Sequence, residues 1–373
     1  MGDTSLLLLV MSATFALSIA LVPVSRALAH RLGAMDTPGP RKVHFDPTPR
    51  TGGIAVFLSF AIVVVAGSLL APHVGESEVL RQQFKGALAL LQEAYRVQGK
   101  LAALALGSAL AFTVGLLDDI LGERFHVLAK ASGQLVAALL LVLGDVRVSF
   151  LPFEWMNTVI TVIWIVGITN AFNLLDNMDG LCAGVAFVAS LVLLLNAISL
   201  NEFFVSLVLV AFMGSLLGFL LFNFLGMGGG RIFLGDCGSL FVGFVMASLT
   251  LLERYLSHAS STLFPVLMPV LVLALPILDT FTVIVIRLRE GRPIYIGDSR
   301  HLSHRLVSLG LSPRQAVLFI WLATFCLGLG ALTLPHATLT RALLVLTQSA
   351  GFVALLLILL FVERRVEERL PAP

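Results

Sequence analysis

Long runs of apolar residues recur along the whole sequence, and this feature limits the accessible folds more than any other. A helix of about 20 apolar residues is long enough to span the hydrocarbon core of a bilayer. We predict eleven such spans, at approximately 4–22, 53–71, 101–117, 127–143, 158–175, 181–199, 203–222, 238–252, 263–286, 315–334 and 341–362. Only 12% of the residues are charged, whereas soluble proteins carry about 25%. The sequence therefore predicts one all-α domain, residues 1–373, that crosses a membrane many times.

The lysines and arginines are distributed unevenly between the two sides that these spans define. The side with the loop 23–52 carries 17 of the 24 basic residues, and the other side carries 7. Cytoplasmic loops of membrane proteins are enriched in Lys and Arg, so the first side is assigned to the cytoplasm. We expect a multi-pass membrane protein with its N-terminus outside and its C-terminus in the cytoplasm. The net charge of +2 is too small to indicate a nucleic-acid partner.

The segment 76–99 on the outer side combines apolar residues at helical spacing with charged residues. This pattern predicts a separate amphipathic helix that lies on the outer membrane surface. The alternative is that the segment simply continues the third span.

Two adjacent carboxylates, Asp118 and Asp119, end the third span on the cytoplasmic side. Neighbouring acids beside hydrocarbon repel each other and are costly to desolvate. A bound cation or a role in proton transfer would offset that cost. The structural alternative is a solvated helix end.

A run of polar residues closes the fifth span. Asn170, Asn173, Asp176 and Asp179 follow one another at intervals of three, so a continuing helix would place them along one stripe. Buried polar groups are costly unless they have partners. Interhelical hydrogen bonds could supply those partners, but a nucleotide or metal site explains the four side chains better.

Two further acids stand near or within spans. Asp236 follows a glycine-rich stretch just before the eighth span, where it could cap the helix. It could instead share Mg²⁺ with a phosphate bound at that helix N-terminus. Asp279 lies inside the ninth span, close to Pro276, which can kink the helix. For Asp279, a functional role and a bond to a neighbouring helix are equally open.

Basic and imidazole side chains gather in two other cytoplasmic loops. The loop before the second span contains Lys42 and His44, which could receive a lipid phosphate at the membrane surface. The loop before the tenth span contains His301, His304 and Arg305, which suit a polyphosphate. The two histidines could instead be half of a zinc site, but no cysteine or acidic residue is positioned to complete one.

All of these groups except Asp279 fall on the side that the basic residues assign to the cytoplasm. Carboxylates for a divalent ion, basic groups for phosphates and apolar walls for a lipid therefore converge on one membrane face. Phosphoryl transfer needs mainly positioning and charge neutralisation. A water-soluble donor that reacts with a membrane-bound acceptor would need this location.

At these residues the chain resembles the polyprenyl-phosphate N-acetylhexosamine-1-phosphate transferase family (WecA/MraY type). The resemblance extends from about residue 36 to residue 316 and rests on segments that occur in the same order: RKVH (41–44) with PRTGG (49–53), GLLDD (115–119), NAFNLLDNMDG (170–180), IFLGDCGS (232–239) and PILDT (276–280). The resemblance implies a helical bundle in the bacterial inner (plasma) membrane, with a cytoplasmic active-site cleft and a lipid groove.

The resemblance also implies the reaction and its partners. Such an enzyme transfers a sugar-1-phosphate from a UDP-sugar to a polyprenyl phosphate such as undecaprenyl phosphate, and it releases UMP. It requires Mg²⁺, which Mn²⁺ could replace, and it initiates a cell-envelope glycan such as lipopolysaccharide or teichoic acid. A homodimer is compatible with this reading.

The matching motifs imply roles for individual residues. Asp236 would bind Mg²⁺, and Asp118 and Asp119 would be catalytic, one of them activating the lipid phosphate. The substrate-binding set is Lys42, His44, Lys130, Asn173, Asp176, Asp179, His301, His304 and Arg305. Within this set, the residues from Asn173 to Asp179 would line the nucleotide-sugar pocket, and those from His301 to Arg305 would contact the diphosphate or the sugar.

Two alternatives stay open beside the WecA-like branch with an N-acetylglucosamine donor. The first is the phospho-MurNAc-pentapeptide branch, which typically has three consecutive histidines in a different setting from that of His301. The second is a secondary transporter of an anionic substrate, which would fit the glycine-interrupted helices. Transporter sites usually lie near the midplane between repeats, whereas here the acids gather at one face and the sequence has no internal repeat.

Overall fold

The computed structural model describes residues 2–36, 47–76, 86–229, 231–253, 255, 263–292 and 300–367. Nine helices in these ranges are long and apolar enough to cross a membrane, and the bent pair Phe264–Val272 and Ala274–Arg289 makes up to ten. The shorter apolar helix Val127–Leu143 occupies the fourth predicted span. Each of the eleven predicted spans therefore coincides with a helix or with the bent pair, and the prediction of an all-α polytopic membrane protein is confirmed.

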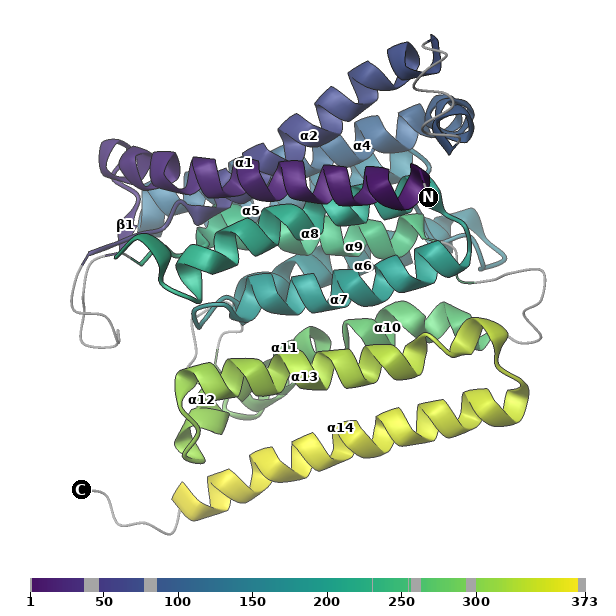
Figure 1. Cartoon of the computed structure of the whole chain (residues 1–373). Helices are drawn as coiled ribbons and strands as arrows, with labels where there is room; N and C mark the ends of the chain where they lie inside the picture. The colour runs from purple at the N-terminus through teal and green to yellow at the C-terminus, as the bar shows by residue number, and fades with distance from the viewer. Residues whose placement is uncertain are drawn as a thin grey trace.

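The elements follow one another in a simple order along the chain (Figure 1). They are α1 (Gly2–Leu32), β1 (Met35–Asp36), β2 (Thr48–Pro49), α2 (Gly52–Glu76), α4 (Gly86–Leu121), η1 (Gly122–Arg124), α5 (Val127–Leu143), α6 (Glu154–Leu175), α7 (Leu181–Ser199), α8 (Phe203–Asn223), η2 (Met227–Gly229), α9 (Gly235–Leu252), η3 (Phe264–Leu267), α10 (Met268–Val272), α11 (Ala274–Arg289), α12 (Leu302–Ser308), α13 (Pro313–Ala331), η4 (Leu334–His336) and α14 (Leu339–Glu367).

The N-terminal part of α4 differs from the prediction. One continuous helix runs from Gly86 to Leu121, so residues 86–99 extend the third span and do not form a separate amphipathic helix. The physical reason is local, because this stretch contains no proline and is rich in Ala, Leu and Gln, which all favour helix. The rest of the proposed amphipathic segment, residues 77–85, lies outside the described ranges.

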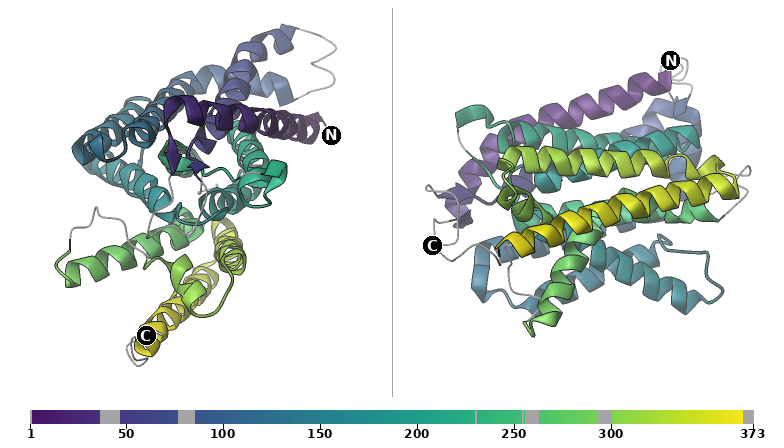
Figure 2. Two further views of the ribbon diagram at one scale, coloured as in Figure 1. Left: turned by 90° about the vertical axis from the view of Figure 1, so that its left-hand side faces the viewer. Right: turned by 90° about the horizontal axis from the view of Figure 1, so that it is seen from below.

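The centre of the bundle is formed by α8 and α9. In the most apolar window of each of these helices 78% of the residues are buried, against 17% in α1 and α14. A helix buried on all sides has to be apolar all round, and small residues allow the neighbouring backbones to come close. At Gly243 in α9, for example, an added Cβ would lie 2.8 Å from the Thr169 Cα in α6. The left view of Figure 2 shows α14 at the periphery of the bundle.

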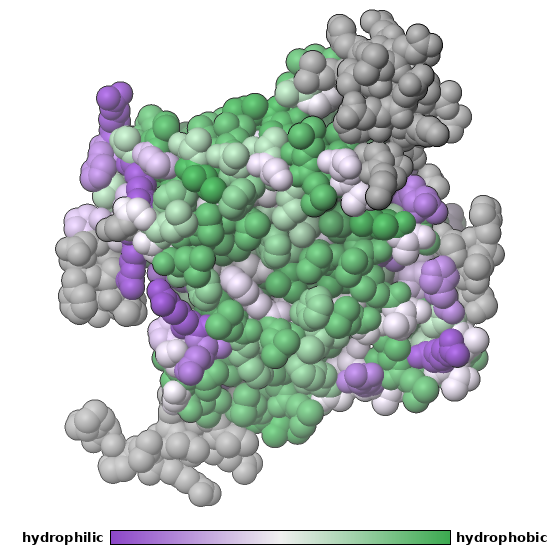
Figure 3. Space-filling view, viewed as in Figure 1, coloured by the Kyte–Doolittle hydropathy of each residue, from purple (hydrophilic) through white to green (hydrophobic). Residues whose placement is uncertain are grey.

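The outer surface and the termini agree with a membrane-spanning bundle. Hydrophobic side chains cover most of the visible face between the two ends of the helices, and hydrophilic side chains gather toward those ends (Figure 3). The N-terminus and the C-terminus lie at opposite ends of the bundle (Figure 1). The C-terminal end is also the end where β1 and α12 lie.

At this end, the segment after β2 is joined to the loop that precedes α9. The backbone N–H groups of Gly52 and Gly53 donate to the carbonyls of Phe233 (2.9 Å) and Leu234 (2.8 Å). The contact is so close that a Cβ at Gly53 would lie 2.2 Å from the Gly238 nitrogen. Only glycine fits this approach, which explains the adjacent glycines and fixes the position of Arg50 beside the start of α9.

Candidate active site

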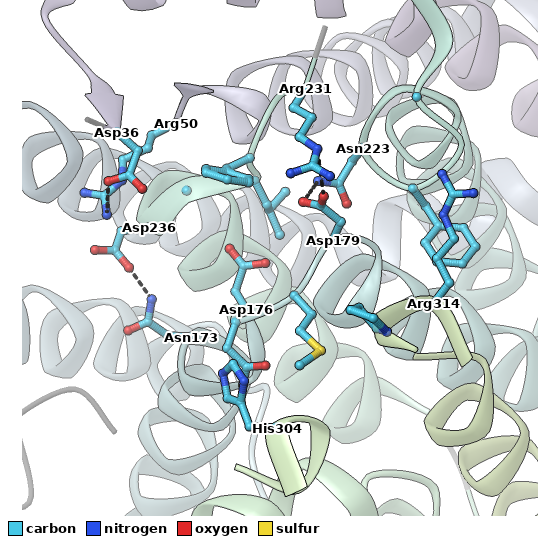
Figure 4. Close-up of a pocket in the computed structure, with 18 of the residues that line it drawn as sticks. Asp36, Arg50, Asn173, Asp176, Asp179, Asn223, Arg231, Asp236, His304 and Arg314 are labelled. Atoms are coloured by element: carbon cyan, nitrogen blue, oxygen red, sulfur yellow. Dashed lines mark hydrogen bonds and ion pairs between the residues drawn. The ribbon is translucent and has the colours of Figure 1, made fainter. Parts of the chain in front are cut away.

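A cavity of about 620 Å³ opens where α4 and α6 end and α9 begins. Its polar lining is dominated by charged side chains that come from separate parts of the chain (Figure 4). The carboxylates are Asp36, Asp119, Asp176, Asp179 and Asp236, and the basic or imidazole groups are Arg50, Arg231, Arg314 and His304. The cavity therefore places acids and cations around one space at one end of an apolar bundle.

Asp119 joins the end of α4 to the start of α9. Its carboxylate accepts hydrogen bonds from the backbone N–H groups of Asp236 (3.0 Å) and Cys237 (2.8 Å). The first N–H groups of a helix have no partner within the helix, so Asp119 caps α9 from another helix. Gly115, one turn earlier in α4, allows this approach, because a Cβ there would lie 2.2 Å from the Asp236 carbonyl oxygen.

Asp236 consequently does not cap its own helix, which is the structural role that the sequence had left open for it. Asp236 lies in the first turn of α9. The N-cap residue of this helix, Leu234, makes no capping hydrogen bond with its side chain. The Asp236 Oδ1 accepts a hydrogen bond from the Asn173 amide, and its Oδ2 lies 3.5 Å from the Lys130 ammonium. The carboxylate keeps 35% of its surface exposed, and it lines the cavity.

Lys130, in the first turn of α5, connects the acids behind the lining. Its ammonium donates to Asp118 Oδ2 (2.7 Å) and to Asn173 Oδ1 (3.1 Å). Asn173 in turn donates to Ser239 Oγ (2.8 Å). Hydrogen bonds of a charged group such as the Lys130 ammonium are stronger than those between two neutral groups. The result is a fixed network that holds the ends of α4, α5, α6 and α9 together.

The polar stripe of the fifth span is divided by the end of α6. Asn170 lies within the helix and exchanges hydrogen bonds with Gln134 of α5 (2.6 and 3.3 Å), so the interhelical alternative is right for this residue. The helix ends at Leu175, and Asp176 is its C-cap. These residues are therefore brought together by the turn that follows α6, and not by a continuing helix.

That turn is held by Asn223 from the end of α8. Asn223 accepts a hydrogen bond from the Gly180 N–H (2.6 Å) and donates to Asp179 Oδ1 (3.3 Å) and to the Ile232 carbonyl (2.9 Å). Gly180 has φ +81°, a conformation that favours glycine. Asp179 also lies 3.8 Å from the Arg231 guanidinium. The side-chain amide of Asn223 therefore holds both the glycine-rich loop before α9 and the turn after α6.

Asp176 carries the clearest sign of crowded negative charge. Burial raises the pKa of the Asp176 carboxyl well above its ordinary value, and the carboxylates of Asp236, Asp119 and Asp179 raise it further. Arg50 opposes this effect. Desolvated like charges favour either a proton or a bound cation. The acidic part of the cavity is therefore suited to a metal ion or to a cationic substrate group.

The donor chemistry of these acids fits Mg²⁺ better than zinc. Within the described ranges, no group of three or more His, Cys, Asp or Glu side chains is arranged to hold a metal ion. Catalytic zinc usually has three protein ligands. Mg²⁺ is bound through one or two carboxylates and takes its remaining oxygen ligands from water and substrate phosphates. A partly exposed carboxylate such as Asp236, beside a space for phosphates, meets that requirement.

The histidine loop contributes one residue to the lining and uses another as an anchor. His304 in α12 lines the cavity, and its pKa is lowered, first by burial and then by His301, with Asp279 opposing. His301 is only 3% exposed, and its Nδ1 lies 2.8 Å from Asp279 Oδ2. Asp279 Oδ1 also accepts a hydrogen bond from the Leu302 N–H (2.6 Å). Asp279 therefore bonds the start of α12, which is the structural alternative that the sequence had left open for it.

The predicted site residues divide into four groups by position. Those that line the cavity are Asp119, Asn173, Asp176, Asp179, Asp236 and His304. Asp118 and Lys130 lie behind the lining and are bonded to it. His301 and Arg305 are not part of the lining, and Arg305 donates from Nε to the Arg300 carbonyl (3.0 Å). Lys42 and His44 lie outside the described residues.

Three arginines of the lining, Arg50, Arg231 and Arg314, are not in the predicted substrate-binding set. Arg50 was part of a recognised motif and is paired with Asp36 (3.0 Å). Arg314 stands in the first turn of α13, after the capping residue Ser312. A cation near a helix N-terminus opposes the helix dipole. That local conflict is a signal that could have indicated a functional role for Arg314.

Comparison with known proteins finds one matching family model and similar proteins from several bacteria. A family model described as "Glycosyl transferase family 4" matches residues 101–253, which include the acids from Asp118 to Asp236. A Bacillus subtilis (strain 168) protein named "Probable undecaprenyl-phosphate N-acetylglucosaminyl 1-phosphate transferase" is 33% identical over 339 residues, with 88% of this chain and 85% of the relative covered.

Two relatives from other bacteria carry similar names. "Decaprenyl-phosphate N-acetylglucosaminephosphotransferase" of Mycolicibacterium smegmatis is 32% identical, covering 82% of this chain and 76% of the relative. "Undecaprenyl-phosphate alpha-N-acetylglucosaminyl 1-phosphate transferase" of Yersinia pestis is 27% identical, covering 84% and 80%. The identity and the length of the first alignment show that this chain belongs to the polyprenyl-phosphate N-acetylhexosamine-1-phosphate transferase family.

Proposed function

We propose that this membrane protein transfers N-acetylglucosamine-1-phosphate from UDP-N-acetylglucosamine to a polyprenyl phosphate and releases UMP. The observation that carries the proposal is the cavity in which Asp236, Arg50 and His304 face one space beside apolar helix ends. The relatives are named for the same transfer to undecaprenyl or decaprenyl phosphate. In the transfer, an oxygen of the lipid phosphate attacks the phosphorus that carries the sugar. A new phosphoanhydride bond forms, and the bond to UMP breaks.

The basic groups of the cavity suit the donor. A UDP-sugar brings a diphosphate whose charge must be neutralised, and arginine binds phosphate oxygens through a planar fork of donors. Arg50, Arg231 and Arg314 line the cavity from three separate segments. His304 adds a ring that its lowered pKa keeps neutral at pH 7, so it can donate one hydrogen bond and accept another. These groups can hold the diphosphate while the acids face the reacting end.

Asp118 and Asp119 have distinct positions for the proposed chemistry. Asp119 lines the cavity while both of its oxygens hold the start of α9. Asp118 is paired with Lys130. We infer that Asp119 positions Asp236 and that Asp118 fixes the Lys130 ammonium beside it. Lys130 can then balance negative charge that gathers near Asp236 during phosphoryl transfer.

Asp236 would hold Mg²⁺, with Mn²⁺ as a substitute, and Asp176 is a further carboxylate in electrostatic contact with it. When bound, the ion would neutralise charge on the phosphates. The chain's own contribution is to hold Asp236 through Asn173 and Lys130. The further partners that we propose are the inner membrane and a second copy of the chain in a homodimer.

We further propose that the cavity faces the cytoplasm. The 17 to 7 distribution of basic residues supports this orientation, as does the position of the C-terminus at the cavity end of the bundle (Figure 1). A reporter enzyme active only in the cytoplasm should therefore be active when fused after residue 373. A fusion that is active only on the outer side would place the cavity away from the nucleotide-sugar supply and would contradict the proposal.

The reaction itself is tested with purified protein, Mg²⁺, undecaprenyl phosphate and UDP-N-acetylglucosamine. We expect UMP release that requires the lipid and stops when EDTA removes the metal. Parallel reactions with UDP-N-acetylgalactosamine and UDP-MurNAc-pentapeptide test the alternative sugar donors. Release of UMP only with UDP-MurNAc-pentapeptide would favour the other branch of the family. No release with any donor, from protein that is folded and inserted, would overturn the proposal.

A further inference from the structure

A second cavity, of about 570 Å³, lies at the opposite end of the bundle. Lys100 of α4 lines this cavity, and Asp118 lies 18 positions further along the same helix. At a rise of 1.5 Å per residue this separation is about 27 Å, close to the roughly 30 Å of a bilayer's hydrocarbon core. The second cavity is therefore at the level of the other membrane–water interface, away from the proposed active site.

The walls of this cavity are suited to hydrocarbon. Leucine, isoleucine, valine and proline side chains from α6, α9 and α10 line it, among them Ile160, Leu251 and Val270. Two aromatic residues with polar tips, Trp164 and Tyr255, complete the wall. Their polar atoms are bonded to Thr250, at 3.0 Å to its hydroxyl and 2.8 Å to its carbonyl. Trp and Tyr are enriched where apolar chains meet headgroups.

The charged groups at this cavity form two regions of opposite sign. The Arg147 guanidinium is bonded both to Asp145 (3.1 Å) and to Glu154, so this triad has one excess negative charge. Lys100 also lines the cavity, and no described residue forms an ion pair or hydrogen bond with its ammonium. One excess cation and one excess anion thus border the same apolar space.

A buried carboxyl is available in the same cavity. Glu253, which follows α9, is only 5% exposed and lines the cavity. The Asn196 amide donates to its Oε1 (2.9 Å), whereas Oε2 has no hydrogen-bond partner within the described part of the chain. A buried acceptor without a partner is costly, so a ligand that donates a hydrogen bond would be favoured here.

We propose that the second cavity binds an outer-leaflet phospholipid whose headgroup carries both a phosphate and a primary ammonium group. The phosphate would pair with Lys100, and the ammonium group would pair with the Asp145–Arg147–Glu154 triad and donate to Glu253 Oε2. The acyl chains would lie on the wall formed by Ile160 and its apolar neighbours. An anionic lipid without an ammonium group would leave the triad and Glu253 without partners.

Native mass spectrometry of the purified full chain tests this proposal directly. The protein is incubated with equal amounts of phosphatidylethanolamine and phosphatidylglycerol, and the lipids that stay bound are counted. We expect a preference for phosphatidylethanolamine of about tenfold, and a loss of about the same factor in Lys100→Ala, as one charge-assisted bond would give. Glu253→Gln keeps the acceptor for Asn196 but replaces Oε2 by a donor, so it should weaken the same lipid selectively.

Arg341→Ala is the matched control, because it removes an exposed cation that does not line this cavity. Lys100 is partly exposed, so its replacement should leave the fold and UMP release unchanged. Equal retention of the two lipids by the wild-type protein would overturn the proposal. Equal effects of Lys100→Ala and Arg341→Ala would overturn it as well, and so would displacement of the phospholipid by a polyprenyl-linked sugar.

Discussion

Asp236→Asn is expected to lower turnover by about a thousandfold or more, which corresponds to about 4 kcal/mol of lost transition-state stabilisation. Asparagine has nearly the shape of aspartate, so Asn173 and the backbone of α9 keep their positions. The negative charge disappears, and with it the proposed Mg²⁺ ligand and the partner of Lys130 at 3.5 Å. Because Asp119 caps α9, the loss should not unfold the helix. The measurement is kcat for UMP release, together with the Mg²⁺ concentration for half-maximal rate.

Glu123→Gln provides the matched control for this substitution. Glu123 is an exposed carboxylate in η1, on the same side of the membrane, and it does not line the cavity. Its replacement should leave kcat within about twofold, since surface substitutions are usually nearly neutral. If Asp236→Asn kept near-normal kcat and the same Mg²⁺ requirement, the carboxylate of Asp236 would have no part in metal binding. Thermal unfolding of both variants shows whether any loss comes from the fold.

The sequence predicted the spans and most of the lining because both depend on local patterns. Apolar runs define the helices, and acids at their ends are costly wherever the helices pack. The actual partners of those acids could not be predicted in the same way. Asp119 caps a helix 117 positions further along the chain, and Asp279 bonds His301 from inside a span. Such contacts depend on how the helices pack in three dimensions, which no local pattern records.

The histidine loop illustrates the same limit more sharply. His301 and His304 are three residues apart, and the motif alone gives them the same role. In the fold, α12 begins at Leu302, so His301 lies before the helix and points to Asp279, whereas His304 lies in the helix and faces the cavity. A difference in burial follows, because His301 is 3% exposed and His304 is only half-buried. The two histidines should therefore differ in what their loss does to catalysis.

We expect His304→Ala to raise KM for the UDP-sugar by about tenfold while KM for the polyprenyl phosphate changes little. Loss of one hydrogen bond to a charged group has an effect of this size. His301→Ala and Asp279→Ala should each lower kcat/KM for the UDP-sugar by about a hundredfold, because each removes the buried contact between the His301 ring and the Asp279 carboxylate. Asp279→Ala also removes the hydrogen bond from the Leu302 N–H. The double variant should therefore lose little more than Asp279→Ala alone, since that variant already lacks the contact with His301.

A double-mutant cycle on kcat/KM for the UDP-sugar therefore separates positioning from direct binding. Ser308→Ala is the control in the same helix, because its hydroxyl donates to the Arg305 carbonyl away from the Asp279 contact, and it should change kcat/KM by no more than about twofold. Strict additivity of His301→Ala and Asp279→Ala would mean that His301 acts on the substrate independently. Stoichiometric zinc that is lost in His301→Ala would contradict both roles and would make the loop a structural metal site. If the cycle is instead strongly coupled and zinc is absent, Asp279 acts from within the membrane span by holding α12, and His304 with it, at the edge of the cavity.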